Sequence, residues 1–145
     1  MGFKKTSETI AISFGVDEAA PNAFIQEEIA LQLDVLNNEI FVVLAVDLDV
    51  TPPDAIAGVD TTTNASISTT SLIAVGNLSQ SNVMAQSSDR IRAAGFVDGG
   101  VGFSRAAEST YTGMVDYIAL IATNNFFVQL QGGNNVAPKG LTGRV

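Results

Sequence analysis

The stretch Glu39-Ile40-Phe41-Val42-Val43-Leu44-Ala45-Val46-Asp47-Leu48-Asp49-Val50 decides the fold, because it is the longest nearly uninterrupted apolar run and is rich in β-branched and aromatic residues. A run of this kind predicts a central strand that is covered on both faces. From Asp47 onward, aspartates alternate with apolar residues, so we expect this end of the strand to leave the core. Pro52-Pro53 follows and ends the strand, since proline lacks a backbone N–H.

Alternation also predicts strands on the N-terminal side of this run. Thr9 to Phe14 alternates apolar with small residues, which is typical of a half-buried strand. Phe24 to Leu36 contains good helix formers, so a helix is the competing interpretation, but a period of two from Glu28 to Val35 favours a strand. Asn37-Asn38 suits a tight hairpin turn. We therefore expect the second and third strands to be antiparallel neighbours.

On the C-terminal side, the sequence predicts a long connection and then more strands. Asp54 to Asn64, which contains Thr61-Thr62-Thr63, is expected to be a surface connection. Ala65 to Val75 is rich in Ser and Thr and predicts a strand at a sheet edge or beneath a loop. Met114 to Ala122 fits both a helix and a buried strand. Further strands are expected at Asn82 to Gln86, Val101 to Ser104, Phe126 to Gln131 and Leu141 to Val145.

This pattern predicts an all-β fold, an antiparallel β-sandwich of about eight strands. The chain has 145 residues, of which 46% are hydrophobic, and this is enough for one core. We expect a flexible arm at residues 1–7 and a single domain at residues 8–145. The last predicted strand reaches the final residue, Val145, so we expect the full polypeptide to continue beyond it.

The composition argues against most catalysis. The sequence contains no cysteine and no histidine. Disulfides, thiolate sites, Ser-His-Asp triads, histidine general bases and ordinary zinc sites each require one of these residues. We therefore predict that the chain is not an enzyme and has no catalytic, cofactor-binding or metal-ligating residues. No cofactor and no small-molecule substrate are expected.

The charge distribution makes nucleic acid an unfavourable partner. The net charge is −8, although only 15% of the residues are charged. Between Thr6 and Ser88 every charged residue is acidic, so this part of the chain would repel a phosphate backbone. The longest uninterrupted apolar run, Ile40 to Val46, is far shorter than the roughly 20 residues of a spanning helix. Polar residues also interrupt the first apolar residues, so we expect a soluble protein, or one exported without a cleaved signal.

Acidic side chains near one end of the sandwich suggest an alternative with a metal ion. Asp47, Asp49, Asp54 and Asp60 supply carboxylate oxygens, which are the ligands that Ca²⁺ prefers. The simpler interpretation places Asp47 and Asp49 on the solvent face of an emerging strand and the other two in a loop. The spacing of an EF-hand is absent, and this favours the simpler interpretation.

Two other patterns have both a structural and a functional interpretation. Arg90-Ile91-Arg92 places two guanidinium groups on one strand face beside Asp89. Ion pairing with the acidic body, within or between subunits, is the simpler interpretation, and phosphate binding is the alternative. Asn64-Ala65-Ser66 and Asn77-Leu78-Ser79 match glycosylation sequons, and both are expected on the surface.

The overall pattern resembles the single jelly-roll coat proteins of viruses. It consists of hairpin-linked strands, a Thr/Ser-rich excursion after the third strand, the segment Asn124 to Asn135 and the final run Leu141 to Val145. The resemblance implies two facing four-stranded sheets of jelly-roll type, self-assembly into a shell and termini that reach a neighbour. The N-terminal arm departs from this family, because many coat proteins that package nucleic acid carry a strongly basic arm. Here the arm has only Lys4 and Lys5, which argues against direct contact with a genome.

Two functional hypotheses result. The first is a structural capsid protein of the virion that assembles with copies of itself and with other capsid proteins. The second is a secreted or cell-surface β-sandwich binding module of the carbohydrate-binding or adhesin type. Such modules usually present aromatic side chains to sugars, but the sequence has no tryptophan and only Tyr111 and Tyr117 as tyrosines. This favours the first hypothesis.

Overall fold

The computed structural model describes the chain except for residues 1–3, 34–35, 37, 57, 93–102 and 109–116, and it describes residues 103–108 as backbone only. The described part contains ten strands and no α-helix, so the prediction of an all-β fold is confirmed. In chain order the strands are β1 (Ser13–Asp17), β2 (Ile25–Ala30), β3 (Phe41–Val43), β4 (Asp47–Val50), β5 (Thr61–Ser68), β6 (Val83–Arg92), β7 (Phe103–Glu108), β8 (Ala119–Ile121), β9 (Asn125–Gly133) and β10 (Gly140–Arg144).

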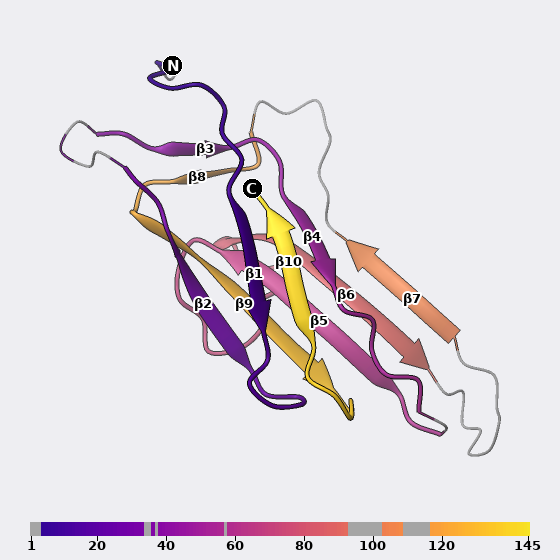
Figure 1. The fold of residues 1–145 in the computed structure, drawn as a ribbon. Coiled ribbons are helices and arrows are strands. Elements are labelled where there is room, and N and C mark those ends of the chain that lie inside the picture. The colour runs from indigo at the N-terminus through magenta and orange to yellow at the C-terminus, as the bar shows by residue number, and fades with distance from the viewer. Residues whose placement is uncertain (1–3, 34–35, 37, 57, 93–102, 109–116) are drawn as a thin grey trace.

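The strands form three antiparallel sheets. The first has the order β1-β10-β4, the second β2-β9-β5-β6-β7, and the third consists of β3 and β8. The three-stranded sheet lies over the five-stranded sheet, and the β3–β8 pair lies at the end where the N-terminal segment is found (Figure 1). Two sheets packed face to face make a β-sandwich, as expected.

The core lies between the two larger sheets. The five-stranded sheet contributes Phe126, Val128 and Leu130, all on one face of β9, and the three-stranded sheet contributes Leu48 and Leu141. These five side chains are almost completely buried. The alternation predicted for Phe126 to Gln131 is therefore confirmed, because it places every second residue of β9 in this core.

The strand pairs are nested along the chain. β5 pairs with β6, β3 with β8, β2 with β9 and β1 with β10. Each of these pairs therefore encloses the previous one in sequence. Residues at the two ends of the chain meet as a result: the backbones of Ile12 and Val145 exchange two hydrogen bonds, of 2.8 and 2.9 Å.

The run from Glu39 to Val50 does not form one central strand, and that expectation is wrong. It is divided into β3 and β4, which belong to different sheets. Leu44 and Ala45 between them are exposed, whereas Val43 and Val46 on either side are buried. An apolar run of this length is compatible with one strand that is covered on both faces. It is equally compatible with two short strands in different sheets, joined by a crossing between them. The alternation in β4 is confirmed, with the aspartates exposed and Leu48 buried.

The predicted hairpin between the second and third strands is also wrong. Asn38 does have a positive φ, of 56°, as a turn residue would. The strands that flank it nevertheless pair elsewhere, β2 with β9 and β3 with β8. Turn chemistry indicates where the chain changes direction, but the pairing partner is chosen by which apolar faces meet in the core.

The Thr61-Thr62-Thr63 run is part of a strand and not of a surface connection. It begins β5, the middle strand of the five-stranded sheet, so the expectation of an edge strand is wrong as well. Threonine is β-branched and favours strands, and its hydroxyl can be satisfied when buried. The Thr61 hydroxyl, for example, donates a 2.7 Å hydrogen bond to the Asp54 carbonyl oxygen. The expectation that this strand lies beneath a loop is correct, as the contacts of residues 69–82 show below.

The remaining segments differ from the predictions mainly in their bounds. The first strand is Ser13–Asp17 and not Thr9 to Phe14, and the short strand expected at Asn82 to Gln86 extends to Arg92. The ambiguous segment Met114 to Ala122 contains the short strand β8, and its first three residues lie outside the described part. The strand expected at Val101 to Ser104 is observed as β7, and Val101 also lies outside the described residues.

Candidate functional site

The four aspartates that suggested calcium do not come together. Asp47 and Asp49 are exposed on β4, Asp54 forms an ion pair with Lys139, and the Asp60 carbonyl oxygen accepts a hydrogen bond from Asn134. Within the described residues, no group of three or more carboxylates is placed to hold a metal ion. The four aspartates therefore do not form one cluster in the described part of the chain.

Asp54 instead joins the loops at one end of the sandwich. Its Oδ1 accepts a 2.6 Å hydrogen bond from the Lys139 ammonium group, which is buried at 5% exposure. Its Oδ2 accepts hydrogen bonds from the backbone N–H groups of Val136 and Ala137, at 2.8 and 2.9 Å. The Lys139 hydrogen bond, followed by the two backbone hydrogen bonds, lowers the pKa of Asp54 to about 2. The carboxylate is therefore ionised at any physiological pH.

Asn135 is the second anchor of this end of the sandwich. Its side-chain amide donates to the Thr62 carbonyl oxygen and accepts from the Asp54 backbone N–H, at 2.8 and 2.9 Å. Its backbone exchanges two hydrogen bonds with the side chain of Asn22. Gly132 makes this packing possible, because a Cβ there would lie 2.6 Å from the Asn135 amide nitrogen. The arrangement ties the loops to one another.

A second polar group is buried beneath residues 69–82. Gln129 on β9 accepts a hydrogen bond from Ser66 and donates to Ser68 and Gln26, at 2.7 to 2.8 Å. The covering loop joins this network through its backbone, since the Gly76 N–H donates to Ser66 and the Leu72 N–H donates to Gln26. All these contacts lie on the face of the sheet opposite the core. This network therefore holds the covering loop against the sheet.

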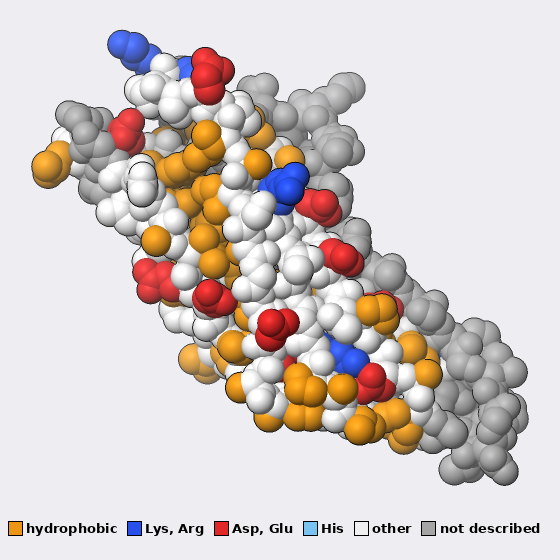
Figure 2. Space-filling view, viewed as in Figure 1, with side chains coloured by type: hydrophobic (Ala, Val, Ile, Leu, Met, Phe, Trp, Pro, Cys, Tyr) orange, Lys and Arg blue, Asp and Glu red, His pale blue; other side chains and the backbone are white. Residues whose placement is uncertain are grey.

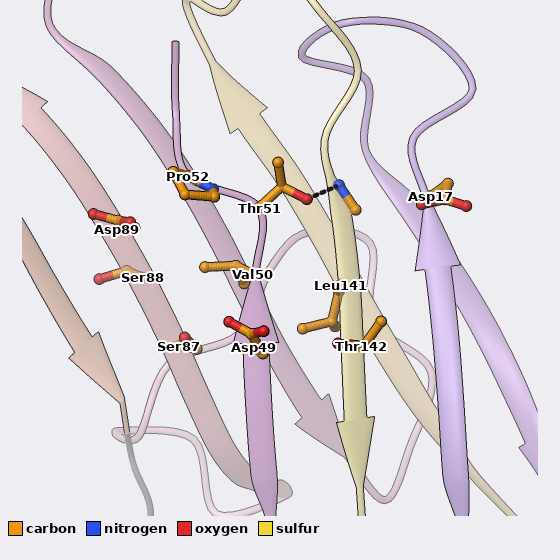
Figure 3. A pocket seen from close by; sticks show the side chains of 11 residues that line it. Asp17, Asp49, Val50, Thr51, Pro52, Ser87, Ser88, Asp89, Leu141 and Thr142 are labelled. Carbon is orange, nitrogen blue, oxygen red and sulfur yellow. Dashed lines mark hydrogen bonds between the residues drawn. The ribbon is translucent and has the colours of Figure 1, made fainter. Parts of the chain in front are cut away.

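A recess of about 640 Å³ lies where β4 of the upper sheet passes over β6 of the lower sheet. Figure 3 shows its lining, which includes Asp49 and Thr51 from one sheet and Ser87, Ser88 and Asp89 from the other. Its described lining offers carboxylates and hydroxyls but no lysine or arginine. Three aspartates and several hydroxyl-bearing residues therefore line the recess.

The side of the sandwich formed by β1 and β2 is open. Both strands are the last strands of their sheets, so each has one unpaired edge within the described part of the chain. Ile12, Phe14, Ile25 and Ile29 lie there and are only partly buried. Figure 2 shows hydrophobic side chains along this side, with acidic side chains beside them. We call these four residues the apolar seam.

The other candidates from the sequence lie apart from one another. Arg90 and Arg92 are exposed on β6, and Arg90 lies opposite Arg105 in the β6–β7 register. The two sequons differ, because Asn77 is in an exposed turn whereas Asn64 is half-buried within β5. The expectation that both lie on the surface is therefore wrong for Asn64. Tyr117 is 43% exposed, and Tyr111 lies outside the described residues.

Sequence reasoning missed Lys139 and Gln129, which anchor the two buried polar groups. Lys139 gave no signal, because a lone lysine in a loop is usually exposed. Gln129 gave a weak signal, since it lies between two apolar residues of an alternating strand and therefore on the face opposite to theirs. That face is buried only because a distant loop covers it.

Comparisons with known proteins found no relative: no family model, no curated protein and no solved structure matches the chain. In the described part of the chain, no helix is long and apolar enough to cross a membrane.

Proposed function

We propose that this chain is a structural subunit that assembles with copies of itself into a viral capsid, and that its sandwich is of the jelly-roll type. The nested strand pairs support the jelly-roll assignment, because a jelly roll forms when one long antiparallel pair of chain halves wraps into two sheets. One strand departs from this scheme. β7 extends the five-stranded sheet beside β6, whereas a jelly roll of two four-stranded sheets would place it beside β4.

The apolar seam is the observation that carries the proposal of self-assembly. It combines partly exposed isoleucines with two unpaired strand edges on the same side of the sandwich. Exposed apolar groups beside polar ones are typical of surfaces that are covered by a partner. Glu27 lies between Ile25 and Ile29 on the same face of β2 and is exposed. A charge at such a position opposes pairing of β2 with an arbitrary strand from another molecule. Only a neighbouring subunit that accommodates the charge can then bind at this edge.

The polar surface of the protein also suits repeated contacts between copies. Most of its polar residues are uncharged, since charged residues make up only 15% of the chain. Neutral polar groups lose less hydration free energy on burial than charges do. Many subunits can therefore pack against one another without a large desolvation penalty at each contact.

Sedimentation velocity and electron microscopy of the purified protein test the proposal. We expect a closed oligomer or particle in the wild type. Ile29→Glu, which puts a charge into the apolar seam, is expected to release smaller species. Ile73→Glu is the matched control, because Ile73 is 98% exposed on the loop of residues 69–82. A wild type that remains strictly monomeric at high concentration would contradict the proposal, and binding on a glycan array would favour the carbohydrate-binding module instead.

A further inference from the structure

The two-stranded sheet of β3 and β8 is apolar on both of its faces. β3 is Phe-Val-Val and β8 is Ala-Leu-Ile, so neither strand contains a polar or charged side chain. In their register Phe41 lies opposite Ile121, and Val42 lies opposite Leu120. Successive side chains of a strand point to opposite faces, so Phe41 and Ile121 share one face and Val42 and Leu120 share the other. We call this pair of strands the small sheet, and the face of Val42 and Leu120 its outer face.

Only one face of the small sheet is covered by the rest of the described chain. Val43 and Ile121 are 3% and 2% exposed and belong to the hydrophobic core. On the outer face, Leu120 is 37% exposed, and Leu44, directly after β3, is 51% exposed. Among the described residues, neither Val42 nor Leu120 is part of the core or packs against it. The small sheet thus has the composition of strands that are covered on both faces, but one face is left open.

The small sheet also lacks the charges that the other free edges carry. The strands that end the two larger sheets all contain a charged residue: Asp17 in β1, Glu27 in β2, Asp47 in β4 and Arg105 in β7. Such charges oppose contact between an edge strand and other molecules. β5 and β9 are uncharged too, but each has a neighbouring strand on both sides. In the described part of the chain, only the small sheet therefore combines free edges with a complete lack of charge.

This lack of charge selects the kind of partner. The chain has a net charge of −8, so two copies repel each other least where the contact itself carries no charge. A contact about a twofold axis uses the same patch on both copies, so a charged residue close to the axis would meet its own like charge. The outer face avoids this repulsion, and it offers no charge by which a partner of opposite charge would be recognised. A second copy of the chain is therefore the partner that fits it.

The N-terminal segment links the small sheet to the apolar seam. Ile12 belongs to the seam, and Ile10 just before it is 56% exposed. Farther along the same segment, the Thr6 hydroxyl donates a 3.1 Å hydrogen bond to Glu39, which shortly precedes β3. Figure 1 shows this segment between β1 and the small sheet. Neighbouring copies can therefore cover the seam and the small sheet in one assembly.

We propose that the outer face of the small sheet packs against the same face of a second copy, about a twofold axis. The contact buries Val42, Leu44 and Leu120 of both copies. A standard interface buries about 800 Å² on each partner. Two strands of three residues provide less than this, so the contact acts together with the apolar seam. The inference deepens the proposed function and rests on it, since it names a second surface through which the copies assemble.

Single-cysteine variants test the contact cleanly, because the chain has no cysteine of its own. In Leu120→Cys, the thiols of two copies should lie close together across the axis. Mild oxidation, or a short bismaleimide, should then give covalent dimers on a denaturing gel. Val42→Cys and Leu44→Cys extend the test across the outer face. Ile73→Cys is the matched control, because Ile73 is 98% exposed on the loop of residues 69–82, and it should stay mostly monomeric on the gel.

A charge variant tests the same contact without a crosslink. Leu120→Glu places two like charges in the contact, so it should weaken self-association about tenfold or more. Sedimentation velocity should then show smaller species than for the wild type, whereas Ile73→Glu should sediment like the wild type. At low protein concentration the Tm of Leu120→Glu should stay close to that of the wild type, because Leu120 lies outside the core.

The outcomes separate this inference from the proposed function. If the wild type assembles but none of the three cysteine variants crosslinks more than Ile73→Cys does, the contact is wrong and self-assembly stands. Unchanged assembly of Leu120→Glu would contradict the contact in the same way. If Leu120→Cys forms dimers but no larger particle is found in the wild type, the contact stands and the capsid proposal is wrong. A monomeric wild type without crosslinks in any variant would contradict both.

Discussion

Both faces of the five-stranded sheet are buried in the middle of β9, but by different means. On the inner face, Val128 and Leu130 of β9 pack against the side chains of the other sheet. On the outer face, Gln129 lies between them in sequence and is equally buried, at 0% exposure, yet it is covered by a loop and held by hydrogen bonds. One strand can therefore be buried on its two faces by two different kinds of contact. Apolar contact fills one face, and complete hydrogen bonding is required on the other.

The largest expected effect comes from the apolar face. Phe126→Ala removes a completely buried ring that packs edge-on against Phe14, with the ring centroids 5.9 Å apart. The free energy of unfolding should fall by about 3 to 5 kcal/mol, since the variant loses burial and leaves a cavity. Urea denaturation measures this loss. Phe127→Ala on the opposite face is the control, because Phe127 is only half-buried; an equal loss there would mean that the two faces do not differ as described.

A smaller loss is expected on the polar face. Gln129→Ala leaves Ser66 without its acceptor and removes two donated hydrogen bonds from Gln129. The free energy of unfolding should fall by about 1 to 3 kcal/mol, the usual penalty for a buried polar group left unpaired. Gln131→Ala on the same face is the control, since Gln131 makes one long hydrogen bond of 3.3 Å. An equal loss in the free energy of unfolding for the two variants would mean that the network beneath the loop contributes nothing to stability.

A pH titration sharpens the comparison by testing a buried contact that carries charge. The pKa of Asp54 is lowered from 3.8 to about 2 in the folded protein, so between these values the unfolded state binds more protons than the folded state. The stability due to Asp54 is therefore fully present above about pH 4 and is lost as the pH falls through about 2. Asp54→Asn should lower the Tm at neutral pH, and its difference from the wild type should shrink in acid. A Tm difference that stays constant from pH 6 to pH 2 would contradict the role of the ion pair.

The smallest effect is expected on the outer side of the covering loop. Ile73 belongs to the loop of residues 69–82 that closes the polar face, yet its own side chain points to solvent, at 98% exposure. Ile73→Ser should therefore change the free energy of unfolding by no more than about 0.5 kcal/mol. Chemical denaturation can distinguish this small change in the free energy of unfolding from the larger loss expected for Gln129→Ala. A large loss would show that the loop is held by apolar contacts as well as by hydrogen bonds.

Some local features could be read from the sequence because they depend on neighbouring residues alone. The alternation of β9 and of β4, the final strand after Lys139 and the positive φ of Asn38 are features of this kind. They follow from the two-residue period of a strand and from the steric freedom of asparagine in a turn.

Long-range choices could not be read in this way. The Glu39 to Val50 run became two strands in different sheets, and Thr61-Thr62-Thr63 became part of a central strand. In both cases the composition was compatible with the structure, but the partner strand lies far along the chain. The position of Asp89 beside Thr63 has the same origin, since it depends on the β5–β6 register.

The sequence by itself determined that this protein is an all-β sandwich, and its lack of histidine and cysteine excludes the familiar chemistry that needs them. Only the tertiary structure decided which strands pair and which polar side chains are buried. The physical reason is that burial of a polar group depends on what covers it, and the covering segments here, residues 69–82 over Gln129 and β4 over β6, are distant in sequence from the residues they cover.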